Sequence, residues 1–394
     1  MIDYNKALNS KIKQMKPSGI RKFFDIAQEM DGVISLGVGE PDFKTPWVIR
    51  QEAIGTLEKG KTCYTANAGL MELRKEISAY FQRSIHTYYD PKSEIIVTVG
   101  GSEGIDLCIR CLVEPGDEVL VVEPSFVCYK PIVSICGGVP VVIETKAENE
   151  FRLTAYELRE KITDKTKLLV LPYPNNPTGA IMSREDLEEI AHVLRDTNIM
   201  VISDEIYCEL TYGGKHCSIA EIEGMRERSI IINGFSKSFA MTGWRLGFLG
   251  GPKEIVSQML KLHQYAIMSS PTTSQYAAIK GLKKCERDVE KMRNEYDQRR
   301  RFVVNGFNKL GLDCFTPQGA FYVFPCIKST GMSSAEFCEK LVYSKKVAVV
   351  PGDAFGECGE GYIRVSYAYS LNHLREALKR IEEFLGDLKN GSIQ

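Results

Sequence analysis

The sequence predicts an α/β fold: a large domain with a doubly wound, mostly parallel sheet covered by helices, joined to a smaller α+β domain. First, short apolar runs alternate with amphipathic segments between residues 95 and 250. Second, most of these runs are β-branched and apolar on both faces, as in strands buried between two layers of helices. Third, the length of 394 residues exceeds what one hydrophobic core usually organises, so we expect two domains.

Seven apolar runs are the candidate strands of the large sheet, and they cover residues 95–99, 118–122, 139–143, 167–171, 199–203, 230–233 and 246–250. Amphipathic segments at 102–112, 154–162 and 183–195 are candidate helices between them. Ser183 is suited to cap the free backbone N–H groups at the start of the last helix. We therefore place residues 45–285 in the large domain.

The pattern changes after residue 285. A charged helix and a mixture of strands and helices are predicted there, at residues 288–310, 320–324, 333–343, 362–367 and 372–388. Without strict alternation, this succession favours an α+β arrangement. We assign residues 286–394 to the smaller domain, together with residues 1–44, which are too few to form a core of their own.

Charge and hydropathy limit the classes of partner. Lys and Arg total 50 against 51 Asp and Glu, and no basic stretch is long enough to follow a nucleic-acid backbone. No apolar run reaches the length of a membrane span, and the first residues lack the apolar core of a signal peptide. We expect a cytoplasmic protein without nucleic-acid or membrane partners.

The 12 cysteines are spread along the chain without the spacing of a disulfide framework, which fits a reducing compartment. Cys108 and Cys111 form a CxxC pair in a predicted helix. No second CxxC and no pair of spaced histidines completes a metal site. We interpret both cysteines as core residues and expect no metal.

Polar residues stand directly after five of the predicted strands. The segments are Gly100-Gly101-Ser102, Glu123-Pro124-Ser125-Phe126, Tyr173-Pro174-Asn175-Asn176-Pro177, Asp204-Glu205-Ile206-Tyr207 and Gly234-Phe235-Ser236-Lys237. In a doubly wound sheet, ligands bind beyond the C-terminal ends of the strands. We therefore expect these residues to meet in one cleft.

Lys237 carries the sharpest chemical signal. Its amine can form a Schiff base with an aldehyde, while Ser236, Ser238 and Arg245 can bind a phosphate dianion. The glycine turn at 100–104 can present N–H groups to an anion, although it matches neither a Walker A motif nor a dinucleotide fingerprint. A lysine taken alone is usually a solvated surface charge, so the interpretation depends on the other residues.

Three further side chains each leave two interpretations open. Asp204 can pair with a protonated ring nitrogen, with Tyr207 and Asn176 donating to a ring oxygen, or it can cap a helix. Phe126 can stack on a planar ring or belong to the core. Arg364, on an otherwise apolar predicted strand, can bind a carboxylate in bidentate fashion or form an internal salt bridge.

In combination these motifs resemble the class I pyridoxal-phosphate-dependent aminotransferases of fold type I, and among them the aspartate and aromatic aminotransferases. The segments that carry the resemblance are Gly39-Glu40-Pro41-Asp42-Phe43, Tyr64-Thr65-Ala66-Asn67-Ala68-Gly69, Asn176-Pro177-Thr178-Gly179, Asp204-Glu205-Ile206-Tyr207, Ser236-Lys237-Ser238-Phe239, Gly243-Trp244-Arg245-Leu246-Gly247 and Arg364-Val365-Ser366-Tyr367-Ala368. The resemblance implies a pyridoxal 5′-phosphate cofactor and amino-acid and 2-oxo-acid substrates. It also implies a homodimer with the active site at the subunit interface.

The resemblance implies a role for each residue. Lys237 would form the Schiff base and move the proton, and Asp204 would pair with the ring nitrogen. Asn176 and Tyr207 would hold the ring oxygen, and Phe126 would stack on the ring. The phosphate would be held by Gly101, Ser102, Glu103, Ser236, Arg245 and the partner subunit's Tyr64. The substrate α-carboxylate would meet Gly39, Asn176 and Arg364.

Substrate preference is indicated by fewer residues. Relatives specific for aspartate tend to carry a lysine in the phosphate-turn segment, where this chain has Ser102. The resemblance places the segment 17–24 over the substrate, with Ile20 offering an apolar contact and Arg21 available to a distal acid. We favour an aromatic or large neutral L-amino acid as donor and 2-oxoglutarate as acceptor.

Three alternatives to this function are weighed. Aspartate aminotransferase and C–S β-lyase activities would use the same cofactor residues, and only the products distinguish them. A non-enzymatic effector domain of a transcription regulator is disfavoured because Lys237 is present. Such a protein would also need a DNA-binding module, for which the segment before Gly39 is too short.

Overall fold

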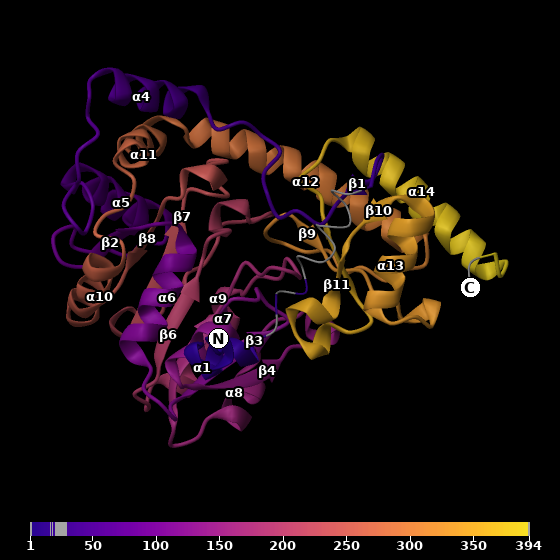
Figure 1. Cartoon of the computed structure of the whole chain (residues 1–394), viewed down its shortest axis with the longest axis horizontal. Helices are drawn as coiled ribbons and strands as arrows, with labels where there is room; N and C mark the ends of the chain where they lie inside the picture. Colours follow the sequence, from indigo (N-terminus) through magenta and orange to yellow (C-terminus); the bar gives the residue numbers. More distant parts are fainter. Residues whose placement is uncertain (1, 16, 18, 20–29, 393–394) are drawn as a thin grey trace.

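The computed structural model describes residues 2–15, 17, 19 and 30–392, and its elements fall into two groups (Figure 1). One group is a seven-stranded sheet with its helices, and the other combines short strands with helices from the C-terminal third. One apolar cluster, which includes Leu73 and Val365, extends through both groups. The predicted domain limits stay a prediction, and the predicted contacts of Ile20 and Arg21 lie outside the described residues.

The seven strands of the large sheet follow the predicted runs closely. They are β2 (Ile95–Thr98), β3 (Glu118–Glu123), β4 (Val139–Glu144), β5 (Thr166–Leu171), β6 (Met200–Asp204), β7 (Ser229–Gly234) and β8 (Gly247–Gly250). Across the sheet their order is β2-β8-β7-β6-β5-β3-β4. The predicted α/β class is therefore confirmed.

Strand β8 departs from the parallel arrangement. It runs antiparallel to both of its neighbours, β2 and β7, whereas the other adjacent pairs are parallel. The connection between β7 and β8 contains the 3₁₀ turn η5 (Thr242–Trp244) and no α-helix, whereas a parallel crossover is usually made by a helix. The sheet is thus mixed, with most of its strands parallel.

Helices bury both faces of this sheet. Along β5, Leu168 and Val170 belong to one apolar cluster, and Leu169 and Leu171 belong to another, because successive side chains point to opposite faces. The first cluster includes side chains of α6 (Gly101–Leu112), α7 (Tyr129–Cys136) and α10 (Lys253–Ala266). The second includes side chains of α4 (Trp47–Glu58), α5 (Met71–Ser84), α8 (Ala155–Lys161), α9 (Arg184–Leu194) and α11 (Thr272–Lys284).

The second group of elements is built around two small sheets. One is antiparallel and contains β11 (Val350–Pro351), β12 (Ile363–Ser366) and β9 (Tyr322–Val323). In the other, β1 (Ile34–Ser35) pairs in parallel with β10 (Val347–Ala348), so part of the N-terminal segment packs on the C-terminal part. The helices of this group are α12 (Glu286–Lys309), α13 (Ser334–Lys345) and α14 (Leu371–Lys389). Two short helices near the N-terminus are α1 (Tyr4–Ala7) and α2 (Ser10–Gln14).

Two helices begin in contrasting ways. At α9 the Ser183 hydroxyl accepts a hydrogen bond of 3.1 Å from the Asp186 N–H, and the Asp186 carboxylate accepts one of 2.8 Å from the Ser183 N–H. The predicted cap at Ser183 is therefore confirmed. At α6 no side chain of the described residues caps the helix, and Gly100 occupies the cap position with φ of 78°. The backbone N–H groups in the first turn of α6 are therefore available to a ligand.

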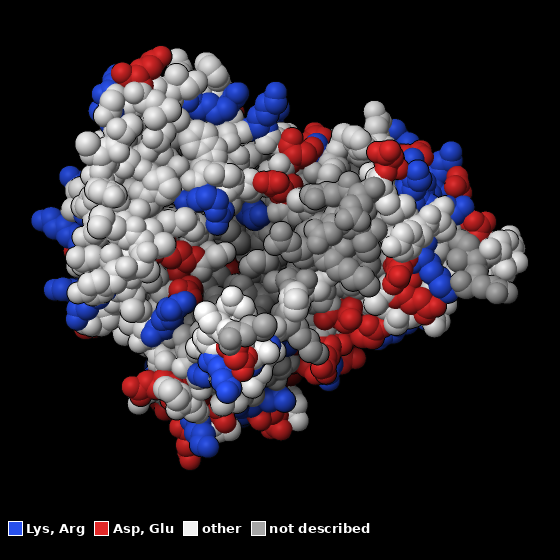
Figure 2. Space-filling model, in the orientation of Figure 1, with Lys and Arg blue, Asp and Glu red and all other residues white. Residues whose placement is uncertain are grey.

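The described residues include no helix with the length and apolarity needed to cross a bilayer. Within the same residues, no group of three or more His, Cys, Asp or Glu side chains is arranged to hold a metal ion. Cys108 is fully buried in the apolar cluster that contains side chains of α6, α7 and α10. Cys111 is only partly buried and packs against the same cluster. On the face shown in Figure 2, Lys and Arg side chains are scattered among Asp and Glu.

Candidate active site

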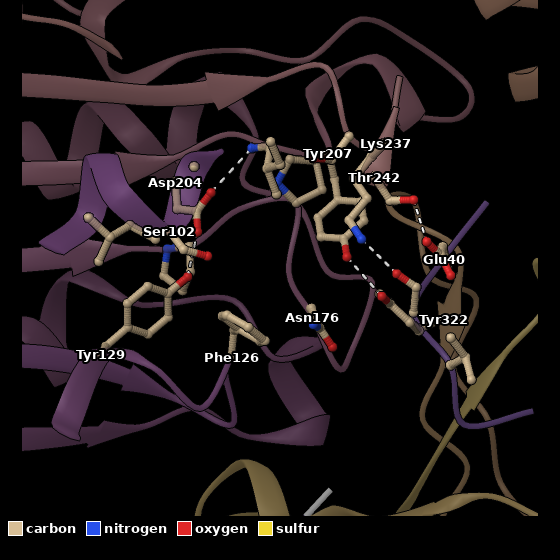
Figure 3. A pocket seen from close by; sticks show the side chains of 18 of the residues that line it. Glu40, Ser102, Phe126, Tyr129, Asn176, Asp204, Tyr207, Lys237, Thr242 and Tyr322 are labelled. Carbon is tan, nitrogen blue, oxygen red and sulfur yellow. Dashed lines mark hydrogen bonds between the residues drawn. The ribbon is translucent and has the colours of Figure 1, made fainter. Parts of the chain in front are cut away.

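A cavity of about 350 Å³ lies beyond the C-terminal ends of β2, β5, β6 and β7, where the sequence predicts a cleft (Figure 3). Its walls combine the polar segments that follow these strands with residues of β9 and β12. The predicted site residues that line it are Gly39, Gly101, Ser102, Phe126, Asn176, Asp204, Tyr207, Ser236, Lys237, Arg245 and Arg364. Polar groups from distant parts of the chain therefore meet in one place.

Lys237 lies just past the C-terminal end of β7. Its Nζ donates a hydrogen bond of 2.6 Å to the carbonyl oxygen of Gly39 (Figure 3). Burial lowers the pKa of Lys237 from 10.5 to about 8; Glu40 opposes this shift, whereas Arg364 and Arg245 add to it. The amine can therefore lose its proton close to neutral pH, as a nucleophilic lysine requires.

Asp204 is the last residue of β6 and is 8% exposed. The Tyr129 hydroxyl donates a hydrogen bond of 2.7 Å to its carboxylate, and the Ile206 N–H donates one of 3.3 Å. Burial raises the pKa of Asp204, and the hydrogen bond from Tyr129 opposes that rise. The next helical turn, η2 (Cys208–Leu210), has Tyr207 at its cap position, so Asp204 is not its cap. A buried carboxylate beside a cavity suits a protonated ring nitrogen.

Asn176 and Tyr207 present hydrogen-bond donors to the cavity. Arg364 donates a hydrogen bond of 2.8 Å to Asn176 Oδ1, and because a guanidinium group has only donors, this contact leaves the Asn176 amide nitrogen free to donate. The hydroxyls of Tyr207 and Tyr322 lie 2.8 Å apart. Burial raises the pKa of both tyrosines, which keeps both hydroxyls protonated. Asn176 and Tyr207 can therefore donate to the same ring oxygen.

Arg364 is a buried cation on β12. It is 3% exposed, and it donates to the Gly37 carbonyl oxygen as well as to Asn176. In the part of the chain that the structure describes, its Nε has no hydrogen-bond partner. The ring centres of Tyr322 and Phe355 lie 4.6 and 4.7 Å from the guanidinium carbon. No acidic side chain of the described residues forms an ion pair with it. A carboxylate ligand would supply the missing anion.

The turn between β2 and α6 is shaped for an anion. A Cβ at Gly100 would lie 2.7 Å from Arg245 Nη2, so glycine allows the guanidinium group to approach closely. The N–H groups of Gly101 and Ser102 have no partner within the helix because they belong to its first turn. Ser236 lines the same cavity. Together these donors fit a phosphate dianion.

Three residues that the sequence places near the phosphate do not line the cavity. Glu103 turns its carboxylate away, toward a backbone N–H and His263, which leaves only its backbone available. Ser238 is buried and donates to a backbone carbonyl oxygen. Tyr64 is 82% exposed and lies outside the cavity of its own chain, and its predicted role belongs to a partner's site.

Several cavity residues were missed by the sequence analysis. Tyr129 contacts Asp204, Tyr322 contacts Tyr207, and Thr242 donates to Glu40 at the cavity wall (Figure 3). The available signal was weak: Tyr322 is a hydroxyl-bearing residue within an apolar strand, and Tyr129 follows closely after the second strand. Neither position predicts its partner.

The functional groups that line this cavity fit pyridoxal 5′-phosphate. Lys237 offers an amine to an aldehyde, Asp204 a carboxylate to a ring nitrogen, and the start of α6 a group of N–H donors to a phosphate. The model of the family described as aminotransferase class I and II matches residues 31–381. The chain belongs to this family. It is accordingly an aminotransferase that uses pyridoxal 5′-phosphate, and the predicted enzyme class and cofactor are confirmed.

Individual relatives place this aminotransferase in the aspartate and aromatic group. It is 46% identical to aromatic-amino-acid aminotransferase 2 of Thermococcus litoralis over 97% of this chain and 99% of that protein. It is 46% identical to the aspartate aminotransferase of Pyrococcus abyssi, with the same coverage of 97% and 99%. The crystal structure of the aromatic aminotransferase from Pyrococcus horikoshii matches with a TM-score of 0.89 at 46% identity, covering 93% of this chain and 99% of that chain.

Proposed function

We propose that this aminotransferase takes its amino group from an aromatic or large neutral L-amino acid and transfers it to a 2-oxo acid such as 2-oxoglutarate. The observation that carries the proposal is the distribution of cations in the cavity. Among the described residues that line it, the cations are Lys237, Arg245 and Arg364. Each has a role toward the cofactor or the α-carboxylate, so no described cation is left for the distal carboxylate of aspartate. The cavity also contains apolar walls, formed by Ile105, Phe126, Pro172 and Pro174.

We assign the roles of the residues from their positions. Arg364, with Gly39 and Asn176, binds the α-carboxylate that every donor and acceptor carries. Phosphate is held by the backbone of Gly101, Ser102 and Glu103, by Ser236 and Arg245, and by the partner's Tyr64. Phe126 covers one face of the ring.

The proton transfers follow from the same positions. Pyridoxal phosphate, when bound, supplies an aldehyde for the substrate amine and a ring that withdraws electrons from the substrate α-carbon. Lys237 Nζ accepts a proton from that α-carbon, because burial lowers its pKa to about 8 and thereby increases the fraction of neutral amine near neutral pH. Asp204 keeps a ring nitrogen protonated, and Tyr207 and Asn176 donate to a ring oxygen. These contacts determine how easily the α-proton is released.

The acceptor raises a separate requirement, because 2-oxoglutarate carries a distal carboxylate. Arg21 is the residue that the sequence offers for it. On this proposal Arg21→Leu raises the KM for 2-oxoglutarate and leaves the KM for phenylalanine nearly unchanged. Equal changes in both values would remove Arg21 from this role.

We infer further that the enzyme is a cytoplasmic homodimer with domains at residues 45–285 and at 1–44 with 286–394. The exposure of Tyr64 supports the dimer, because a side chain that serves a partner's site must project from its own subunit. Equilibrium sedimentation tests this state, and Tyr64→Ala should weaken cofactor binding only if the chain associates.

The test of substrate preference compares kcat/KM for phenylalanine, leucine and aspartate with 2-oxoglutarate as acceptor. We expect phenylalanine to exceed aspartate by at least about tenfold, because the described part of the cavity offers a side chain apolar contacts and no free cation. Ser102→Lys should move the preference toward aspartate. Ser102→Gln, which introduces a long side chain without the charge of lysine, should not. A preference of the unaltered enzyme for aspartate contradicts the proposal. Release of pyruvate and ammonia from a cysteine S-conjugate without an acceptor would indicate β-lyase activity instead.

A further inference from the structure

Glu103 presents a problem for a phosphate site. It is the third residue of α6, within the turn whose N–H groups face the cavity. A carboxylate at this position carries the same charge as phosphate, and it can itself accept hydrogen bonds from the free N–H groups of the turn. Yet Gly101 and Ser102, directly before it, line the cavity, and Glu103 does not.

His263 holds this carboxylate behind the turn. His263 Nδ1, on α10, lies 2.5 Å from Glu103 Oε1, and the Val99 N–H donates to Glu103 Oε2. Both carboxylate oxygens are therefore engaged away from the cavity. The side chain of His263 is 0% exposed and that of Glu103 is 11% exposed, so the contact is shielded from water and correspondingly strong.

The surroundings of His263 show that this contact is its main polar interaction. Its Nε2 is buried and has no hydrogen-bond partner among the described residues, an arrangement that destabilises the fold. Val256 and Met259, on the same helix, belong to the apolar cluster that α6, α7 and α10 form against one face of the large sheet. A leucine would fill the same space without an unpaired nitrogen, so what the histidine adds at this place is the bond to Glu103.

We propose that His263 is a positioning residue for the cofactor phosphate and acts through Glu103. By holding the carboxylate against the Val99 N–H, it keeps a negative charge away from the phosphate. It also leaves the N–H groups of Gly101 and Ser102 open to the ligand. The proposal concerns phosphate affinity and is independent of which amino acid the enzyme prefers.

The test compares the Kd of the apoenzyme for pyridoxal 5′-phosphate with its Kd for pyridoxal, which lacks the phosphate, in absorbance titrations. His263→Leu is expected to raise the Kd for pyridoxal phosphate roughly tenfold and to leave that for pyridoxal within about twofold. His263→Asn can still donate from near the Nδ1 position, so it should retain most of the affinity. Adding Glu103→Gln to His263→Leu removes the freed charge and should recover affinity as well.

Met259→Ala is the matched control. Met259 lies one helical turn earlier on α10, is equally buried, and packs in the apolar cluster. This variant should lower the Tm without changing the ratio of the two Kd values. The proposal is overturned if His263→Leu raises both Kd values equally or changes neither. It is also overturned if Met259→Ala changes the ratio as much as His263→Leu.

Discussion

The cofactor side and the substrate side of the cavity are built differently. On the cofactor side, Lys237, Asp204 and Gly101 each lie at or just past the C-terminal end of a strand of one sheet, so one set of secondary-structure elements brings them together. On the substrate side, Gly39 and Arg364 come from opposite ends of the chain and meet through tertiary packing.

The two sides also differ in how their charges are satisfied. Asp204 has a hydrogen bond of 2.7 Å from Tyr129, whereas Arg364 has no anionic partner among the described residues and one nitrogen without any partner. On the cofactor side the Asp204 carboxylate is thus stabilised by contacts within the protein. On the substrate side the Arg364 guanidinium group remains available to an anionic ligand. Changes on the first side should alter mainly kcat and cofactor binding, and changes on the second mainly KM.

The largest effect is expected for Lys237→Ala. Loss of the amine removes both the covalent attachment and the proton carrier, so kcat should fall by more than about 10,000-fold. Steady-state assays measure the loss, while far-UV circular dichroism should show a retained fold. Turnover within tenfold of the unaltered enzyme would show that Lys237 is not the reactive amine.

Asp204→Asn should have the next largest effect. The amide cannot stabilise a protonated ring nitrogen, so kcat should fall about 100- to 1,000-fold with little change in donor KM. Tyr129→Phe, which removes only the supporting hydrogen bond, should cost about tenfold or less. An equal loss in both variants would make the contact with Tyr129, rather than the charge, the decisive feature.

Arg364→Leu probes the substrate side. It should lower kcat/KM by about 100-fold for donor and acceptor alike, because both carry the α-carboxylate. The Kd for pyridoxal phosphate should stay within about twofold, since the residue acts on the substrate. Weakened cofactor binding would show that the two sides of the cavity are not separable.

The buried amine predicts a pH-dependent stability of the apoenzyme. The pKa of Lys237 is lowered from 10.5 to about 8, so between these values the unfolded chain binds more protons and stability rises with pH. Lys237→Met should therefore raise the free energy of unfolding by up to about 3 kcal/mol at pH 7, and the gain should vanish as pH rises toward 10.5. Urea titrations across this range measure the difference, and a gain independent of pH would exclude the ionisation as its cause.

The smallest effect is expected for Tyr322→Phe, which tests the link between the two sides. Tyr322 contacts Tyr207 through a hydroxyl pair and lies against the Arg364 guanidinium group. Loss of one hydroxyl should lower kcat/KM about three- to tenfold. A change confined to kcat would assign Tyr322 to the cofactor side, and one confined to KM would assign it to the substrate side.

Much of the sheet was predictable because buried parallel strands are apolar on both faces. Runs such as 167–171, which correspond to β5 (Thr166–Leu171), therefore stand out from their flanks. The direction of β8 was not predictable from its composition, since an apolar strand has the same pattern in either direction. The connection after β7 contains no α-helix, which favours the antiparallel direction.

The candidate site was predictable where side-chain chemistry and chain position coincide. Asp204 ends strand β6 and Lys237 lies three residues past the end of β7, and both line the cavity. Tyr129 and His263 were missed because their partners are 75 and 160 residues away in the chain. Neither has a neighbouring motif that indicates its contact.

The sequence by itself determined the fold class, the enzyme family and the cofactor, because ordered motifs and strand periodicity are recorded in local residue patterns. Only the tertiary structure decided where the Glu103 carboxylate points, which groups surround Arg364, and how far the amine of Lys237 is buried. Hydrogen-bond partners and desolvation depend on which elements pack together in space. A residue's neighbours in the chain do not specify them.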